Sequence, residues 1–328
     1  MLKSAVTDRR SNQAMMLPTQ LSSVDQAAEL PARSLHLAIG MFDGVHLGHR
    51  AVVEAAVHSA RVNGGLAGVL TFWPHPSALF QPENPTKLIQ DAATKSRLLL
   101  ALGVDVVITQ PFTPGLAAVT AEEFLPWLQH RLPRLATVYV GENFRFGHQR
   151  RGDVASLVAS GRQRGVRVFS APRVNLDGEP ISSTRIRGQL ERGDIAAANA
   201  LLGYHYFAEG VVTAGKRLGR TIGFPTLNLQ WSPQLRPRLG VYAVRVSGSR
   251  SPQPRPAVAN YGLRPTVENA SEPRLEAHLL GDCPFSEGDE IKIEWLQFLR
   301  PEAKFANVEE LRAQIARDRA AALEYFDR

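Results

Sequence analysis

The chain has 328 residues, a net charge of +7 and 44% hydrophobic residues. Domains usually hold ~100–200 residues, so this length predicts two domains, and the composition gives each enough apolar residues for a core. No run approaches the ~18 apolar residues of a membrane span, and we expect neither a secretory signal nor a membrane partner. The single cysteine, Cys283, excludes an internal disulfide and a cysteine-based zinc site, which favours a cytoplasmic protein.

Arginine dominates the basic residues: of 38 in total, six are lysine. Because arginine binds phosphate in a bidentate manner, a phosphorylated ligand is one interpretation. An arginine-rich surface without a ligand is the other. A nucleic-acid partner is not expected, since the sequence has no block of five like charges and no basic stripe interleaved with aromatic residues.

In chain order, residues 1–30 are expected to form a flexible tail, and residues 35–171 alternate between strand-like and helix-like runs. The expected strands cover residues 35–40, 66–72, 104–109, 136–141 and 166–171, and the expected helices cover residues 49–64, 91–103, 120–132 and 152–165. We expect Pro126 to interrupt the third helix. This alternation is typical of βαβ units, so the first half is predicted to be an α/β domain with a parallel sheet.

The texture of the sequence changes near residue 204. Residues 181–203 are expected to form two short helices. The runs rich in Val, Thr and Tyr that follow lie at residues 206–215, 240–248, 256–262, 274–280 and 289–299, between Gly and Pro residues. They predict an antiparallel barrel or sandwich. A closing helix is expected over residues 307–328, with Asn307 as its N-cap and Glu310 three residues further on.

The stretch "GMFDGVHLGH" (residues 40–49) predicts a strand, a glycine-containing turn and the start of a helix. His46 and His49 are three residues apart, so they lie on one helix face. A helix N-terminus at the carboxyl end of a parallel strand favours phosphate, to which two imidazoles could donate hydrogen bonds. A zinc site and ordinary surface histidines are the alternatives.

A second polar cluster, "ISSTRIR" (residues 181–187), places three hydroxyl groups and two arginines at a predicted helix start. It could bind phosphate, or it could simply be an N-capping cluster, which Ser and Thr commonly supply. The stretch "GVVTAGK" (residues 210–216) has the glycine and lysine spacing of a phosphate-binding P-loop. However, Arg217 follows where that motif needs Ser or Thr, and residues 211–213 predict a strand, so we reject the P-loop interpretation.

Several ordered motifs carry a family resemblance. In the first half, "GMFDGVHLGH", "TFWPHP", "GENFRFGHQRRGD" and "ISSTRIR" closely resemble the adenylyltransferase half of the bacterial bifunctional riboflavin kinase/FAD synthetases. In the second half, "GRTIGFPTLNL", "GVYAV", "NYGLRPTV", "LEAHLL" and "LRPEAKF" resemble the riboflavin kinase half. The resemblance implies a Rossmann-like nucleotidyltransferase domain over residues 31–203. It also implies an antiparallel β-barrel kinase domain with a terminal helix over residues 204–328.

For the first half, the resemblance implies that His46 and His49 are catalytic and steady the α-phosphate of ATP. The other ATP-binding residues that it implies are Gly40, Phe42, Asp43, Asn143, Ser182, Ser183, Thr184 and Arg187. It assigns Pro74, His75 and Pro76 to the flavin side of the same site, although His75 could also be an ordinary loop histidine.

For the second half, the resemblance implies that Thr226 and Asn228 coordinate Mg²⁺, which prefers a few protein oxygens together with phosphate and water. Residues at a spacing of two share one strand face; a buried Thr after a Pro is the alternative interpretation. Glu276 would be the general base that takes the proton of the riboflavin 5′-hydroxyl, unless it pairs with Arg274 instead. Gly219, Arg220 and Arg300 would contact ATP or the flavin.

The implied activity is the phosphorylation of riboflavin to FMN, followed by adenylylation of FMN to FAD with release of pyrophosphate. The expected ligands are therefore Mg²⁺, ATP, riboflavin, FMN and FAD, and weak self-association stays open. Two rivals are a nucleotidyltransferase whose barrel is only a scaffold, and a nucleic-acid-binding barrel joined to a nucleotide-sensing domain. The sequence departs from the family at Tyr204-His205-Tyr206, where Arg-Pro-Tyr is common, and "GDCPFSEGD" lacks a Tyr-Gly pair.

Overall fold

The computed structural model describes residues 20–214, 223–263 and 273–327. Within these residues the chain forms two compact units, neither of which is continuous in sequence. The first comprises the described part of Met1–Gly40 together with Val53–Pro76 and Leu99–Ser170. The second comprises Met41–Val52, Ser77–Leu98 and the described part of Ala171–Arg328.

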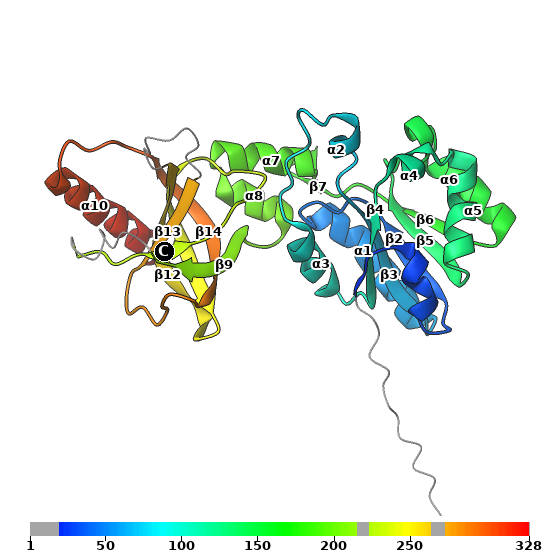
Figure 1. Ribbon diagram of the computed structural model, residues 1–328, viewed down its shortest axis with the longest axis horizontal. Helices are drawn as coiled ribbons and strands as arrows, with labels where there is room; N and C mark the ends of the chain where they lie inside the picture. Colours follow the sequence, from blue (N-terminus) through cyan, green and yellow to red (C-terminus); the bar gives the residue numbers. More distant parts are fainter. Residues whose placement is uncertain (1–19, 215–222, 264–272, 328) are drawn as a thin grey trace, which may run out of the picture. The chain divides into compact units, whose positions relative to one another are not determined.

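The first unit is built on a six-stranded sheet with the order β1-β4-β3-β2-β5-β6 (Figure 1). Its strands are β1 (Gln20–Leu21), β2 (Leu35–Ile39), β3 (Leu66–Trp73), β4 (Val106–Pro111), β5 (Leu135–Gly141) and β6 (Arg167–Ala171). The pairs β1/β4, β4/β3, β3/β2 and β2/β5 are all parallel, which confirms the predicted parallel sheet.

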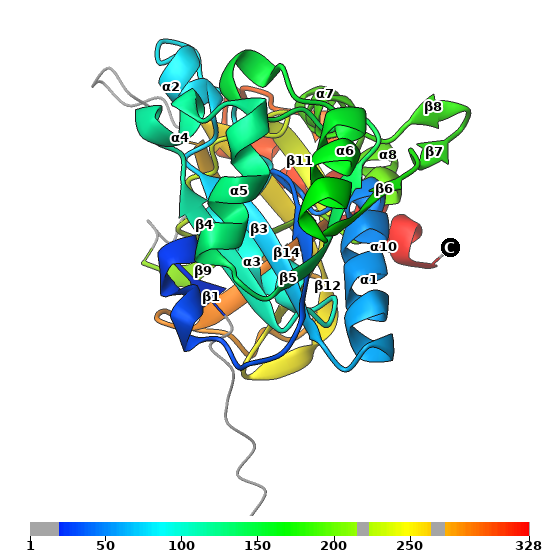
Figure 2. The same cartoon turned by 90° about the vertical axis from the view of Figure 1, so that its right-hand side faces the viewer.

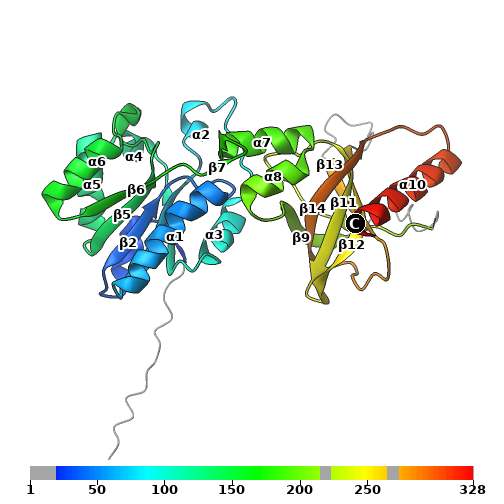
Figure 3. The same ribbon diagram turned by 180° about the vertical axis from the view of Figure 1, so that it is seen from behind.

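Helices cover both faces of this sheet, which explains why its central strands are almost wholly apolar. α5 (Ala121–Arg131) and α6 (Val154–Arg164) lie in front of the strands in Figure 2 and share one buried core with them. The part of α1 (Leu47–Val62) that belongs to this unit buries Val53, Ala56 and Ala60, and α1 is seen in front in Figure 3.

Two expectations for the first unit were wrong. The flexible tail does not extend over residues 20–30, because β1 pairs with β4 and the 3-10 helix η1 (Val24–Glu29) buries Val24 in the core. The backbone N–H of Val24 also donates to the side chain of Gln110 at 2.9 Å. The second error is the interruption at Pro126: α5 continues through this proline as one helix, started by a capping box between Thr120 and Glu123.

Two short helices that were not expected from the sequence occur, one in each unit. They are α2 (Ser77–Phe80) in the second unit and α4 (Pro114–Ala118) in the first, and neither buries a residue. Without a buried apolar face, four or five residues leave no helical periodicity to detect.

The second unit contains a closed barrel with the strand order β10-β13-β12-β11-β14-β9, and each adjacent pair is antiparallel. The strands are β9 (Phe207–Thr213), β10 (Leu227–Leu229), β11 (Gly240–Gly248), β12 (Ser251–Leu263), β13 (Pro273–Leu279) and β14 (Glu290–Pro301). The structure thus selects the barrel over the sandwich. Because Val211, Val212 and Thr213 lie in β9, it also supports the rejection of a P-loop at this position.

Three helices pack against the barrel within the same unit. α7 (Ser183–Arg192) and α8 (Ile195–Leu202) are the two predicted short helices, and their apolar residues belong to the barrel's core cluster. The terminal helix α10 (Val308–Asp327) begins after Asn307, whose side chain accepts a hydrogen bond from the backbone of Glu310 at 2.8 Å, as expected of an N-cap. None of the helices in the described ranges is long and apolar enough to cross a membrane.

By contacts, the predicted boundary between residues 203 and 204 falls inside the second unit. Asn199 of α8 illustrates this continuity: its side chain donates to the carbonyl of Trp295 at 2.9 Å and accepts from the backbone of Tyr206 at 2.7 Å. α8 is therefore joined by hydrogen bonds to both ends of the barrel sequence.

Candidate active sites

The first candidate site lies in the turn that connects β2 to α1. Gly44 has a φ of +79°, and Phe42 and Val45 also have positive φ angles, of 51° and 40°. Non-glycine residues rarely adopt this backbone region, and such positions cluster at functional sites. A Cβ on Gly44 would come within 3.0 Å of the end of the Ile89 side chain, so the positive φ and the close packing both favour glycine there.

His46 and His49 follow this turn, as the spacing predicts. Their rings are stacked with centroids 3.6 Å apart and an interplanar angle of 16°. Phe42 packs edge-on against His49 at 5.4 Å. The Nδ1 atom of His49 is buried and has no hydrogen-bond partner among the described residues. A buried polar atom without a hydrogen-bond partner destabilises the folded state, so a hydrogen bond from a ligand would be favourable at this position.

Both imidazoles are neutral near pH 7. Burial is the main cause that lowers the pKa of His46 to about 4. Burial also lowers the pKa of His49 well below its usual value, and the charges that His46 and Lys95 would carry lower it further. Neutral imidazole retains one N–H, so the pair can donate hydrogen bonds without bringing charge of its own.

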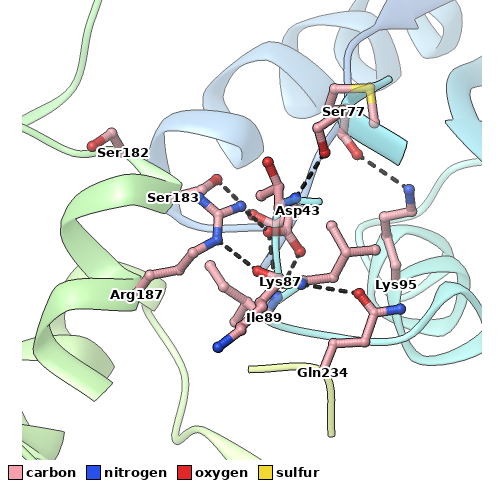
Figure 4. Close-up of polar contacts among 12 residues, drawn as sticks. Asp43, Ser77, Lys87, Ile89, Lys95, Ser182, Ser183, Arg187 and Gln234 are labelled. Carbon is pink, nitrogen blue, oxygen red and sulfur yellow. Dashed lines mark hydrogen bonds and ion pairs between the residues drawn. The ribbon is translucent and has the colours of Figure 1, made fainter. Parts of the chain in front are cut away.

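Asp43 is a buried residue whose side chain connects the turn to two other segments (Figure 4). Its side chain is 6% exposed. The carboxylate accepts a hydrogen bond from the backbone of Ile89 at 3.0 Å and forms an ion pair with Arg187 at 2.5 Å. Burial raises the pKa of Asp43, and the charge of Arg187 opposes that rise. Arg187 also donates to the carbonyl of Lys87 at 2.8 Å. The two predicted ATP-binding residues therefore contact each other in this structure and join α7 to the turn.

The "ISSTRIR" cluster acts largely as the capping alternative predicts. Ser182 is the N-cap of α7 and accepts from the backbone of Arg185 at 3.2 Å. The hydroxyl of Ser183 donates to the carbonyl of Asp43 at 2.9 Å, which adds a second link between α7 and the turn. Thr184 is exposed. The N-terminus of α7 thus lies beside the turn.

Residues 87–95 complete this site, although no sequence motif points to them. Leu88 accepts from the backbone of Leu235 at 3.3 Å and donates to the side chain of Gln234 at 3.2 Å. Lys95, on α3 (Ala92–Leu100), is buried and donates to the carbonyl of Met41 at 3.2 Å (Figure 4). Nothing in "NPTKLIQDAATK" distinguishes these residues from a loop and a surface helix.

The remaining predicted residues of the first half lie in the first unit. The backbone of Gly40 donates to Leu70 at 3.1 Å at the end of β2. Pro74, His75 and Pro76 follow β3, and the Trp73–Pro74 peptide is cis. Asn143 lines a cavity of about 220 Å³ beside the start of α6. A larger cavity of about 580 Å³, between η1 and the end of α5, contains none of the predicted residues.

The second candidate site lies on one strand face of the barrel. Asn228 of β10 is paired with Glu276 of β13, and Glu276 is paired in turn with Asn260 of β12. The flanking residues Leu227 and Leu229 are buried, so alternation turns this row away from the core. The structure thus brings together two of the predicted kinase residues. Arg274 shares the strand face of Glu276, so an ion pair between them is compatible with the same geometry.

Two observations concern the oxygens of this row. The Oδ1 atom of Asn228 is buried without a hydrogen-bond partner among the described residues, and Thr226 is exposed just before β10. His278 of β13 fixes the segment ahead of Thr226, since its Nδ1 lies 2.8 Å from the carbonyl of Pro225 and its ring contacts Phe224. His278 lies in the motif "LEAHLL", but the motif alone predicts no role for it.

The other predicted kinase residues lie elsewhere. Arg300 is on β14, which neighbours neither β10 nor β13. Its Nε and Nη2 atoms each donate a hydrogen bond of 2.7 Å to the carboxylate of Asp318 on α10. This bidentate ion pair favours a structural role for Arg300. Gly219 and Arg220 lie outside the described residues. In the described ranges, no group of three or more His, Cys, Asp or Glu side chains is arranged to hold a metal ion.

These features define a class of protein: an enzyme that transfers phosphate-containing groups. The same chain has a nucleotidyltransferase-type histidine turn (residues 41–49) and, on its barrel strands, a row formed by Asn228 and Glu276. Comparison with known proteins agrees. Residues 29–185 match the family model described as FAD synthetase, and residues 202–326 match the one described as riboflavin kinase.

Full-length relatives are similar throughout. The bifunctional riboflavin kinase/FMN adenylyltransferase of Escherichia coli strain K12 is 37% identical over 93% of this chain and 97% of its own length. The protein of the same name from Listeria monocytogenes is 34% identical over 88% of this chain and 92% of its own. A crystal structure titled macrolide-efflux protein, from Streptococcus pneumoniae, has a TM-score of 0.82 and 27% identity over 92% of this chain and 97% of that one. The chain belongs to the bifunctional riboflavin kinase/FMN adenylyltransferase family.

Proposed function

We propose that the chain phosphorylates riboflavin to FMN with ATP and then transfers an adenylyl group from a second ATP to FMN, releasing pyrophosphate and forming FAD. One observation carries the proposal: each candidate site falls in the family region whose reaction it suits. The histidine turn lies within residues 29–185, and the Asn228–Glu276 row lies within residues 202–326.

In the kinase reaction, Glu276 is the proposed general base. It takes the proton of the riboflavin 5′-hydroxyl as that oxygen attacks the γ-phosphorus of ATP, and ADP leaves. The support is its register: Glu276 lies directly opposite Asn228, on the face that points away from the apolar core. Phosphoryl transfer depends mainly on positioning and charge neutralisation, so the base contributes only part of the rate enhancement.

Mg²⁺ is the proposed metal of this site, where it would neutralise phosphate charge and align the transferring group. Asn228 and Thr226 would hold it. The unpartnered Oδ1 of Asn228 fits that role, and two neutral protein oxygens suit Mg²⁺, which completes its shell with phosphates and water. Mg²⁺ is also proposed for the adenylyl transfer.

In that transfer, the proposed role of His46 and His49 is to donate hydrogen bonds to the α-phosphate as its oxygens gain charge. Their neutrality supports this, because a neutral donor pair keeps its protons through the reaction. Asp43 and Arg187 position the turn. Ser182, Ser183 and Thr184 are proposed to face the phosphates from the start of α7, Phe42 and Gly40 to border the nucleotide, Asn143 to act near the phosphates or FMN, and Pro74, His75 and Pro76 to act on the flavin side.

The same proposal covers location and organisation. We place the enzyme in the cytoplasm, without a nucleic-acid or membrane partner. We also retain the functional boundary near residue 204, which coincides with the start of the riboflavin kinase match at residue 202.

The decisive experiment is an incubation of the purified chain with riboflavin, ATP and Mg²⁺, followed by chromatographic separation of the flavins. FMN appearing first and FAD second is the expected result. FAD formation from added FMN without any riboflavin phosphorylation would instead favour the scaffold-barrel alternative, and unchanged riboflavin would refute both activities.

A further inference from the structure

One buried charge beside the histidine turn has no role in the reaction as described so far. Lys95, on α3, is 4% exposed, and lysine is almost never buried to this degree unless its charge has partners. Its Nζ donates to the carbonyl of Met41 at 3.2 Å (Figure 4). Met41 immediately precedes Phe42, which has a positive φ of 51° and packs against His49.

The charges around Lys95 come from three other elements. The carboxylate of Asp43, in the turn, raises the pKa of Lys95, whereas burial has the larger effect and lowers it to about 8. Arg187 of α7 forms an ion pair with the same carboxylate. His49 of α1 is close enough for the charge of Lys95 to lower the pKa of its imidazole. The buried carboxylate of Asp43 is therefore paired with Arg187, and its charge also acts on Lys95, beside two neutral imidazoles.

Keeping an ammonium ion at this buried position has a cost. An ammonium ion taken out of water loses several kcal/mol of solvation, which its contacts in the folded chain must offset. A methionine or leucine would fill the same buried position without that loss. The arrangement suits a site into which further negative charge is brought, and phosphate groups bring it.

We propose that Lys95 is a positioning residue for adenylyl transfer: its ammonium group fixes the Met41 carbonyl and adds positive potential where His46 and His49 meet the phosphates of ATP. This inference rests on the adenylyl transfer proposed above and extends it to a residue of α3. The structure already provides the link, since Lys95 contacts the turn directly and both histidines follow the turn at the start of α1.

The test compares Lys95→Met, Lys95→Arg and a control, Arg97→Met, in the full-length chain. Arg97 is two residues away on the same helix, its side chain is 54% exposed, and it pairs with Glu209. Lys95→Met should lower the kcat of FAD formation from FMN and ATP by about 10²–10³, the usual effect of losing one electrostatic contact to a transition state. Riboflavin phosphorylation should be unchanged, and so should both activities of Arg97→Met.

Lys95→Arg keeps the charge and should retain FAD formation to within about tenfold of the wild type. Thermal stability separates positioning from a merely structural role. Lys95→Met leaves Asp43 in its ion pair with Arg187, so the variant should stay folded at the assay temperature while the activity falls. A loss of activity that only follows a loss of stability would overturn the proposal.

A pH profile gives a readout that packing alone would not change. FAD formation by the wild type should decline as pH rises through about 8, because Lys95 loses its proton there. The decline should be absent up to about pH 10 in Lys95→Arg, since a guanidinium remains charged. The same descending limb in both proteins, or a Lys95→Met variant within threefold of the wild type, would refute the role of Lys95. A wild-type chain that forms no FAD would refute the proposed adenylyl transfer itself, so the two failures are distinguishable.

Discussion

At the scale of single residues, the protonation state of His46 has a consequence for stability as well as chemistry. In the folded chain its pKa is lowered to about 4 from 6.5, so between these values the unfolded chain binds more protons than the folded one. The free energy of unfolding therefore falls as pH drops from about 7 towards 4, and is unaffected by this group above 7. The shift corresponds to about 3 kcal/mol, since one pKa unit is about 1.36 kcal/mol.

Denaturant titrations of the wild type and of His46→Gln, at pH 7 and at pH 4.5, measure this term. The wild type should lose about 2–3 kcal/mol more than the variant on acidification, because glutamine does not titrate. Equal losses in the two proteins would mean that His46 has the same pKa in the folded and the unfolded chain, and a smaller loss for the wild type would mean that folding raises its pKa.

Replacing either histidine should separate the two activities. His46→Ala or His49→Ala removes one donor from the stacked pair, and we expect FAD formation to fall by about 10²–10³. Riboflavin phosphorylation should stay near the wild-type rate, because the Asn228–Glu276 row lies on the barrel strands β10 and β13. Parallel assays of the same preparation with riboflavin and with FMN provide the measurement. An equal loss of both rates in a folded variant would contradict the assignment of two separate sites.

Glu276→Gln tests the other site. Glutamine keeps the shape and one acceptor oxygen but cannot take the hydroxyl proton, and removal of a general base typically costs ~10²–10⁴ in rate. We expect the lower half of that range, since phosphoryl transfer relies more on metal and alignment. Steady-state kinase kinetics, with FAD formation from added FMN as the internal control, decide the matter. A near-normal turnover would show that another group accepts the proton.

Which residues could be anticipated depended on how local their signal is. His46 and His49 were found because a spacing of three on a helix is visible in the sequence. The ion pair between Asp43 and Arg187 was not, although both residues were named, since it joins positions far apart in the chain. Lys95 was missed for the same reason: only the folded chain shows that this side of α3 is buried. Family resemblance supplied Glu276, which composition alone would not have distinguished.

At the scale of secondary-structure elements, α10 is attached to the barrel by a buried ion pair. Asp318 is 7% exposed at its side chain, its two oxygens each contact Arg300 at 2.7 Å, and Gln314 donates to it at 2.8 Å. Such a pair adds little compared with apolar residues of the same size, but removing one partner leaves a buried charge and typically costs about 3–5 kcal/mol.

Asp318→Ala and Arg300→Ala should therefore destabilise the chain by similar amounts, about 3 kcal/mol each, with the double variant well short of the sum. Thermal and denaturant unfolding measure this. The pair also tests the ATP or flavin contact expected of Arg300. If Arg300 only holds α10, the two variants should have the same effect on the KM for ATP, and the same effect on the KM for riboflavin. A selective rise in either KM for Arg300→Ala would restore its predicted binding role.

The strands and long helices were predictable because their apolar runs are continuous or periodic. β2 is buried along its whole length, and α5 begins with a Thr–Glu capping box that is visible in the sequence. The residues of β1 and η1 were assigned to a tail because two strand residues and one short turn carry no period. Their burial depends on β4 and α5, which lie far away along the chain.

At the scale of the whole molecule, the two ways of dividing the chain give different expectations for fragments. The family matches meet between residues 185 and 202, whereas contacts assign α7, α8 and all later described residues to one unit. The core cluster of the barrel includes apolar residues from both helices, namely Ile186, Leu190, Ile195, Ala198, Leu201 and Leu202. A fragment that starts at residue 204 would expose the surface on which they pack.

We therefore expect residues 181–328 to retain riboflavin kinase activity and residues 204–328 to be much less stable, or insoluble. Burial of a Leu or Ile side chain contributes about 1.5–3 kcal/mol. Losing the burial of several such side chains would therefore remove a large part of the 5–15 kcal/mol by which a typical domain is stable. The shorter fragment also lacks Asn199, which bonds the backbones of Tyr206 and Trp295. Expression of both fragments, with melting temperatures and kinase assays, provides the comparison. Equal stability and activity would mean that the barrel folds without α7 and α8, and that the functional boundary near residue 204 is also the structural one.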